Sequence, residues 1–320
     1  MYFPYIRGRQ FDLLALRDLV EKNLLHEHIV PVIEPVSLSS TLVSTITQFN
    51  TKKHPLAIIQ NPEVGSFSEE FGNFDGAIGN ASRKLDFKAA MLQPAVLQAL
   101  IMNNEAPGVL SDIVALGIQK QDILVVLNDR DMLKQYQNLF ASDAPRYTII
   151  PDEGTFRRNI TENKVVLTDS FQRQERNADY NRREDESFSD IHLYYRDEGY
   201  VGFADYSIIG DSYNEVGFAP YAVAIHIVYP AIDKSLRVRH FVSDSNQDIN
   251  NPAQKFYQAL KKMVQWYEKN ERVVPLTLGL KILLDHYQAQ TYPGLGSLKK
   301  LTIMHHLELM GKLLDGGLSV

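Results

Sequence analysis

Residues 29–59 read IVPVIEPVSLSSTLVSTITQFNTKKHPLAII, and this stretch decides the fold. It holds a continuous apolar run at Ile29–Ile33, then apolar residues at helical spacing (Leu38, Leu42 and Ile46), and then a second apolar run at Leu56–Ile59. Short, continuous, β-branched runs are typical of strands that are covered on both faces. The stretch therefore predicts a strand, a helix and a second strand parallel to the first.

The same unit recurs along the chain. Six further apolar runs resemble the first two: Lys88–Leu92, Ile123–Leu127, Tyr147–Ile150, Val165–Leu167, Val201–Ala204 and Ala222–Tyr229. Eight strand–helix units in about 250 residues are typical of a closed α/β barrel of the (β/α)₈, TIM-like type. An open, doubly wound sheet is the alternative architecture.

Three features extend this plan. A polar stretch, Ser170–Glu198, predicts a long loop after strand 6, because it exceeds an ordinary connection. The eighth run continues through residues 230–234 into Leu236–Val242, which predicts a hairpin extension at strand 8. Helical patterns follow to the C-terminus. We therefore expect a barrel domain at residues 1–270 and extra C-terminal helices at residues 271–320, packed on the barrel.

Composition excludes several classes of protein. The 320 residues are 44% hydrophobic and 22% charged, as in a globular protein, and they include no cysteine, which excludes disulfides, thiolate nucleophiles and zinc ribbons. The net charge of −6 makes nucleic-acid binding possible but not favoured. No apolar run reaches the roughly 20 residues of a membrane helix, and Met1–Pro4 lacks the pattern of a secretory signal. We expect a cytoplasmic protein that does not bind membranes.

Polar side chains follow most of the predicted strands, at the end where barrel enzymes place their active sites. Carboxylates that could together hold Mg²⁺ or Mn²⁺ are Glu34, Asp129, Asp169 and Asp205. Candidates for proton transfer or catalysis are Asp152, Asp169 and His226. Two structural alternatives stay open, because Asp after a strand is also a common helix N-cap and His226 lies inside an apolar run.

The long loop carries four arginines and a tyrosine within residues 171–183. Arginine forks bind phosphate oxygens in pairs, and an aromatic ring can stack on a base. Candidate substrate-binding residues are Arg130, Arg173, Arg176, Tyr180 and Arg182. The acidic run at residues 184–186 nearly cancels this charge, so a solvated, mixed-charge surface is the alternative interpretation.

Several motifs are shared with one bacterial family. They are the opening MYFPYIRGRQFDLLALR (residues 1–17), IVPVIEP (29–35), RNADY (176–180), GFADY (202–206) and HFVSDSN (240–246). The chain resembles, over nearly its whole length, an uncharacterised bacterial family that looks related to the phage Beta protein family. This resemblance implies a phage-defence or mobile-element context and a restriction-nuclease-like partner protein encoded nearby. It implies no catalytic residues.

Two functional hypotheses follow. The first is a metal-dependent enzyme that acts on a phosphorylated or nucleotide-like substrate at the barrel mouth. The second is a non-catalytic scaffold subunit that binds a nuclease-family partner through the hairpin and the C-terminal helices.

Overall fold

The computed structural model describes residues 1–72, 78–214 and 220–316, and the chain divides into two compact units. Unit 1 consists of Met1–Asn23, Glu27–Thr168 and Tyr194–Tyr206. Unit 2 consists of Leu24–His26, Asp169–Leu193 and Ser207–Val320. The chain passes into unit 2 after the strands that end at Thr168 and Asp205, so both long crossings begin at the carboxyl end of a strand.

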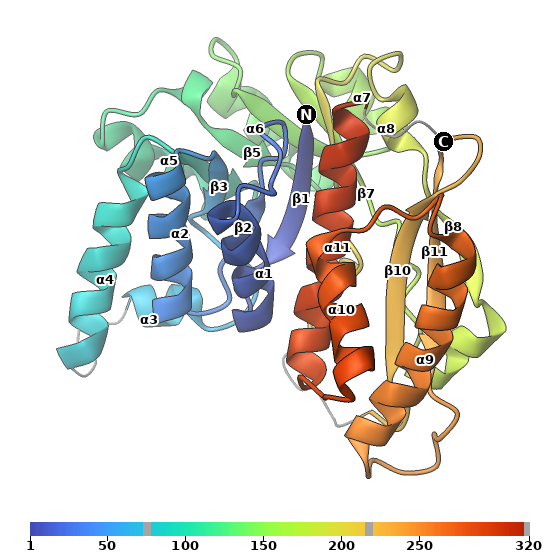
Figure 1. The fold of residues 1–320 in the computed structure, drawn as a ribbon. Coiled ribbons are helices and arrows are strands. Elements are labelled where there is room, and N and C mark those ends of the chain that lie inside the picture. Colours follow the sequence, from blue (N-terminus) through green and yellow to red (C-terminus); the bar gives the residue numbers. More distant parts are fainter. Residues whose placement is uncertain (73–77, 215–219, 317–320) are drawn as a thin grey trace. The chain divides into compact units, whose positions relative to one another are not determined.

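Unit 1 is a closed barrel of parallel strands, which confirms the predicted fold class (Figure 1). Its strands are β1 (Tyr2–Arg7), β2 (Val32–Glu34), β3 (Leu56–Ile59), β4 (Val96–Ile101), β5 (Leu124–Val126), β6 (Tyr147–Pro151), β7 (Lys164–Thr168) and β9 (Gly202–Asp205). The barrel closes where β1 pairs with both β2 and β9, with Tyr5 opposite Val32 and Phe3 opposite Ala204.

Helices alternate with these strands. They are α1 (Gln10–Glu21), α2 (Ser40–Lys52), α3 (Phe67–Gly72), α4 (Ile78–Met91), α5 (Ala106–Ala115), α6 (Leu133–Phe140) and α7 (Gly154–Asn159), with 3₁₀ turns η1 (Lys120–Asp122) and η2 (Arg130–Met132). Of the short α8 (Ile191–Tyr194), only Tyr194 belongs to unit 1. Helix α2 shows why such a segment forms. Ser39 caps it by accepting a hydrogen bond from the Leu42 amide at 3.1 Å, and Ile46 and Phe49 are buried on one side.

Two of the eight predicted barrel strands are wrong. Lys88–Leu92 belongs mostly to helix α4, and the strand at this place is β4. Ala222–Tyr229 overlaps β10 (Ala224–Pro230), which pairs only within unit 2. The missing strand is β1 at the very start, so the long insertion follows the seventh barrel strand, β7, and not the sixth.

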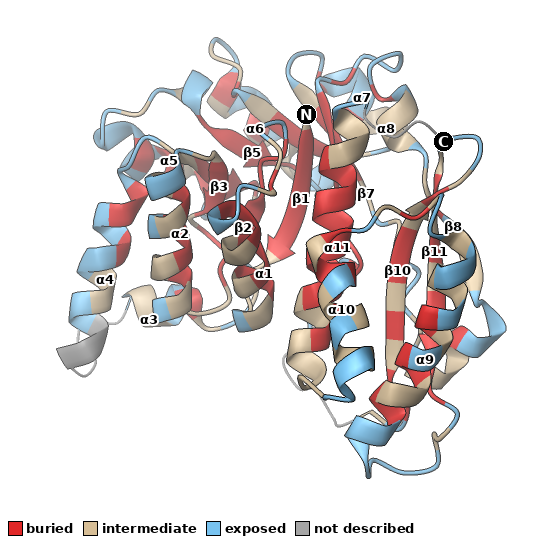
Figure 2. Ribbon diagram, viewed as in Figure 1, coloured by how far each residue is buried: buried red, intermediate tan, exposed pale blue. Residues whose placement is uncertain are grey.

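The barrel interior is packed with apolar side chains, as is usual for an eight-stranded barrel. Figure 2 accordingly shows strands such as β1 and β2 as buried. The large rings of Phe3 and Tyr5 share this space with small residues such as Ala57 and Ala204. Gly202 belongs to the same arrangement, because a Cβ atom there would lie 2.7 Å from the Phe3 ring. The packed interior leaves the ends of the barrel as the places where a ligand could bind.

Unit 2 contains a three-stranded antiparallel sheet in the order β10–β11–β8, with β11 at Leu236–Val242 and β8 at Asp185–Ser189. Its remaining elements are the 3₁₀ segment η3 (Asn177–Arg182) and the helices α9 (Pro252–Asn270), α10 (Leu278–Ala289) and α11 (Leu295–Leu314). The sheet therefore combines the predicted hairpin with a strand from the long polar insertion.

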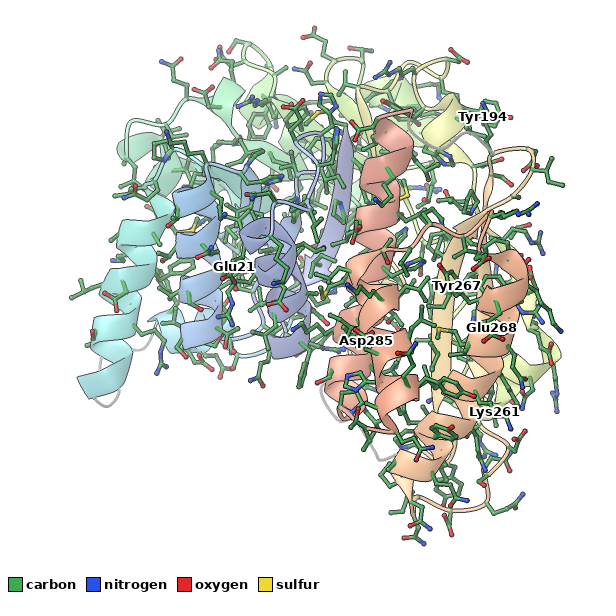
Figure 3. The ribbon with its side chains drawn as sticks, viewed as in Figure 1. Glu21, Tyr194, Lys261, Tyr267, Glu268 and Asp285 are labelled. Carbon is green, nitrogen blue, oxygen red and sulfur yellow. The ribbon has the colours of Figure 1, made fainter. Side chains whose placement is uncertain are left out.

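Helix α9 covers one face of this sheet. The Trp266 ring lies 5.1 Å from the Tyr229 ring and 5.4 Å from the Phe241 ring, measured between centroids. Lys261 and Glu268, labelled in Figure 3, lie on the exposed side of the helix.

The domain boundary expected at residue 270 differs from the division seen in the structure. The hairpin, the insertion and all three C-terminal helices share one unit there.

Two adjacent histidines of α11 are fully buried in unit 2. His305 contacts the Val228 carbonyl through Nε2 at 2.7 Å and the Thr277 hydroxyl through Nδ1 at 2.7 Å. His306 contacts the Ser207 hydroxyl through Nδ1 at 2.8 Å. Burial lowers the pKa of His305 to about 4 and the pKa of His306 to about 3. Both are therefore neutral in the folded protein near pH 7.

This burial predicts a loss of stability in mild acid. An unfolded histidine has a pKa near 6.5, so below that pH the unfolded state binds protons that the folded state does not. The free energy of unfolding should fall between pH 6.5 and pH 4, by up to about 1.4 kcal/mol per pH unit for each histidine. Urea unfolding at pH 7.5, 6.5 and 5.5 measures this slope. His306→Gln should flatten it, and an unchanged slope in that variant would contradict the assignment.

Candidate functional site

The carboxyl end of the barrel in unit 1 carries a ring of polar side chains above the apolar interior. Side chains two residues apart on a strand share a face. Tyr5 of β1 points into the barrel, so Arg7, two residues later, also faces the barrel axis. Val32 of β2 points into the barrel, so Glu34 does so for the same reason. Asn61 and Asn103 occupy the corresponding positions after Ile59 and Ile101.

Hydrogen bonds join these residues into one network. Glu34 is fully buried and forms an ion pair with Arg7. It also accepts hydrogen bonds from the Tyr5 hydroxyl at 2.7 Å and from the Glu63 amide at 2.9 Å. A carboxylate in this position needs all three donors, because an ionised group without partners is costly to bury.

The network continues through two asparagines. The Asn103 side-chain amide donates to Glu63 at 3.0 Å, and its oxygen accepts from Asn61 Nδ2 at 3.0 Å. Asn61 also bonds both the amide and the carbonyl of Ile101, at 2.9 and 2.8 Å. The polar ring is thus held rigidly to the strand ends, as a binding site requires.

A cavity of about 540 Å³ lies beside this network, at the carboxyl ends of β4, β5 and β6. Its lining residues are Glu63, Met102, Asn103, Asn104, Asn128, Asp129, Arg130, Met132, Glu153 and Phe156. The volume suits a small-molecule ligand. Three asparagines supply both donors and acceptors, and Arg130 supplies a cation whose Nε donates to Glu153 at 2.9 Å.

A second cavity in unit 1, of about 500 Å³, lies at the opposite, amino end of the barrel. Val96, Leu97 and Tyr147, at the starts of β4 and β6, contribute to its lining. Barrels of this type carry their active sites at the carboxyl end. The cavity beside Asn103 and Asn128 is therefore the stronger candidate.

The structure gives three of the predicted site carboxylates in unit 1 a structural partner. Asp129 caps η2 by accepting from the Asp131 amide at 2.9 Å, as the N-cap alternative predicts. Asp152 accepts from Arg157 at 2.8 Å. Asp205 is 2% exposed and accepts from the Tyr2 hydroxyl at 2.7 Å. It follows the inward-facing Ala204 and so lies on the outer face of the barrel wall.

The fourth predicted metal ligand, Asp169, belongs to unit 2. It accepts from the Asp211 amide at 3.2 Å, and burial raises its pKa. Within residues 1–72, 78–214 and 220–316, no group of three or more His, Cys, Asp or Glu could hold a metal ion. Binding of Mg²⁺ or Mn²⁺ stays a prediction, which the thermal measurements proposed below include.

The arginine-rich segment also lies in unit 2. Arg173, Arg176 and Arg182 are exposed, and Arg173 donates to the Ser212 hydroxyl at 2.7 Å. Tyr180 is 3% exposed, so the structure corrects the expectation that its ring stacks on a base. Its ring packs instead 4.6 Å from the rings of both His226 and His240.

His226 lies on β10, directly opposite His240 on β11. It is therefore not at the end of a barrel strand, as predicted, but on the sheet of unit 2. The predictions made from the sequence did not include Arg7 or Glu63 among the site residues. Polar residues stand two positions after an inward-facing strand residue at four places, which are Arg7, Glu34, Asn61 and Asn103. This spacing identifies them only once the strand boundaries are known.

The comparisons with known proteins add no assignment. No protein-family model, no curated protein and no solved structure matches the chain. None of the helices in the described part of the chain is both long and apolar enough to span a membrane. The resemblance noted in the sequence stays a prediction, and the candidate site stands on its geometry.

Proposed function

We propose that the chain is an enzyme that binds a phosphorylated or nucleotide-like substrate in the cavity at the carboxyl end of its barrel. The observation that carries this proposal is the 540 Å³ cavity itself, since it lies where barrel enzymes bind their substrates and its lining is largely polar. Its second support is the rigid network through Glu63 and Asn103, two residues that also line the cavity.

The lining indicates how such a substrate would bind. Asn104 and Asn128 match hydroxyl groups or base edges, because a side-chain amide both donates and accepts. Arg130 has a side chain that is 64% exposed, so its guanidinium can turn from Glu153 to a phosphate. Glu153 would then lose its cation and become available to accept a proton.

Thermal unfolding with nucleotides, sugar phosphates and their unphosphorylated counterparts tests this proposal, each in EDTA, Mg²⁺ and Mn²⁺. A ligand at 100 times its Kd stabilises the folded state by about 2.7 kcal/mol. Arg130→Gln should weaken binding of the phosphorylated compound by about tenfold or more, because a charge-assisted hydrogen bond contributes about 1.5–3 kcal/mol. Binding of the unphosphorylated counterpart should change little.

Arg157→Gln is the matched control. Arg157 is also exposed and also paired with a carboxylate, Asp152, but it does not line the cavity. Its removal should leave ligand binding unchanged. No stabilisation by any compound, or equal effects of the two substitutions, would contradict the proposal.

The scaffold hypothesis retains one supporting observation in unit 2. Ile232, in the turn between β10 and β11, is 92% exposed, more than the other exposed large apolar side chains of the described residues. A partner of the restriction-nuclease-like kind implied by the resemblance would bury it. Ile232→Ser should then abolish co-purification of the two proteins, and an intact complex would contradict this alternative. Deletion of α11 is a poor test, because its residues Leu301–Gly311 are buried.

A further inference from the structure

Unit 2 contains a chain of three titratable side chains on three adjacent strands. His226 on β10 lies opposite His240 on β11, and their Nδ1 atoms are 2.7 Å apart. His240 Nε2 lies 3.3 Å from Glu186 Oε1 on β8. Glu186 pairs with Val238, two residues before His240, so the register of the sheet places all three side chains on one face.

The chemistry of these groups fixes where the protons lie. An ionised carboxylate only accepts, so His240 must donate to Glu186 through Nε2–H. The Nδ1 atom of a neutral His240 is then an acceptor, and His226 donates to it through Nδ1–H. This leaves the lone pair of His226 on Nε2. Nε2 of His226 has no hydrogen-bond partner among the described residues. It is also not one of the fully buried side-chain atoms that lack a partner, so it is not sealed off from solvent.

The surroundings of both imidazoles disfavour the charged form. His240 is 2% exposed, whereas His226 is partly exposed. The Tyr180 ring packs against both, and the Phe171 ring lies 5.1 Å from that of His226. Burial lowers the pKa of both histidines. The chain of contacts thus leads from the Glu186 carboxylate through His240 to the partly exposed imidazole of His226, and these three residues are called the relay below.

Other charged groups border this relay. Arg183 donates to the second oxygen of Glu186 at 3.3 Å, and Asp185 of β8 acts on His240 by its charge. Tyr180 comes from η3, and the charge of Arg173 acts on its hydroxyl. Arg173 and Arg183 are both exposed; Arg183 contacts the relay directly at Glu186, and Arg173 lies near enough for its charge to act on Tyr180. Guanidinium groups of this kind recognise phosphate oxygens.

We propose that His226 is the general base of a second site in unit 2, where it activates water for attack on a phosphate ester. The O–H bond of the water breaks as an N–H bond forms on Nε2, and the oxygen attacks phosphorus. The bond between phosphorus and the ester oxygen breaks, solvent water protonates that leaving oxygen, and Nε2 returns its proton to water, which restores the neutral imidazole. His240 and Glu186 are positioning residues, because they fix the tautomer and stabilise the imidazolium. This proposal does not rest on the cavity of unit 1.

Diethyl pyrocarbonate, which acylates neutral imidazole nitrogens, tests the availability of Nε2 on the intact folded protein. Peptide mass spectrometry gives the rate at His226, with N-acetylhistidine as an internal standard. We expect the rate at pH 5.5 to stay within about twofold of the rate at pH 7.5, whereas that of an ordinary histidine of pKa near 6.5 falls about tenfold. No reaction at His226, or a tenfold fall, would overturn the proposal.

Glu186→Gln separates a positioning role from a purely structural one. The substitution keeps the size of the side chain, so the sheet should persist, as circular dichroism would verify. Loss of the charge should slow acylation of His226 by about threefold or more, because the carboxylate raises the basicity of the relay. An unchanged rate would show that the three residues only pack together.

Inorganic phosphate tests the substrate class. It should protect His226 from acylation but not the exposed His28, and Arg173→Gln should weaken that protection severalfold. Absence of protection would overturn the phosphate-ester assignment. None of these readouts involves Arg130, so a failure here is distinguishable from a failure of the barrel cavity to bind its ligand.

Discussion

Replacing Arg7 by methionine should lower the free energy of unfolding of the barrel by about 3–5 kcal/mol, the usual cost of leaving a buried charge without its partner. Glu34, with which Arg7 pairs, has no exposed surface. The Tyr5 hydroxyl and the Glu63 amide would remain as its donors, but neither carries a charge. Urea unfolding followed by circular dichroism measures the loss.

A double-mutant cycle identifies the cause. Glu34→Gln keeps an acceptor for Tyr5 and Glu63 but removes the negative charge. The double variant Arg7→Met, Glu34→Gln should therefore be more stable than Arg7→Met alone. Arg157→Met is the control, since its exposed pair with Asp152 should contribute about 0–1 kcal/mol. A loss below 1 kcal/mol at Arg7, or a double variant less stable than the single one, would contradict this reading of the barrel mouth.

Gly279→Ala should destabilise unit 2 by about 3 kcal/mol, at the upper end of the usual cost of overpacking. A Cβ atom at Gly279 would lie 2.2 Å from the Leu301 carbonyl oxygen and 2.8 Å from the His305 amide. Both are backbone atoms of α11 and cannot rotate away. Relief requires α10 and α11 to separate, which would also disturb the bond between Thr277 and His305.

The single tryptophan makes this effect measurable in unit 2. Trp266 packs against Tyr229 and Phe241 of the sheet, so its fluorescence reports on that core during urea unfolding. Gly108→Ala in α5 is the control, because a Cβ there meets nothing within 4 Å and should be neutral or gain up to about 1 kcal/mol. Equal stabilities of the two variants would show that α10 and α11 do not approach as closely as described.

The barrel could be predicted from the sequence, but two of its strands could not. β1 contains Pro4, which lacks an amide hydrogen and weakens the strand pattern. β4 is interrupted by Gln98, a buried polar residue that bonds the Met91 carbonyl and Gln60. The apolar run of β10 resembles a barrel strand, because periodicity does not reveal which strand will be its neighbour.

The candidate site was predictable in its position but not in its side chains. Glu34 and Asp205 both end a barrel strand, yet one points into the barrel and the other lies on its outer face. Side chains alternate between the two faces of a strand, so an error of one residue in the strand boundary assigns a side chain to the wrong face. The pairing of His226 with His240 depends on the register of a hairpin, which the sequence does not specify.

Hydrogen exchange with and without the most stabilising phosphorylated compound tests the central proposal most directly. Binding in the candidate cavity should slow exchange in the segments that contain Asn103, Asn128 and Glu153, and Arg130→Gln should remove that protection. Protection confined to residues 91–98 and 116–118, which line the cavity at the amino end, would contradict the proposal. So would a ligand that leaves exchange in unit 1 unchanged.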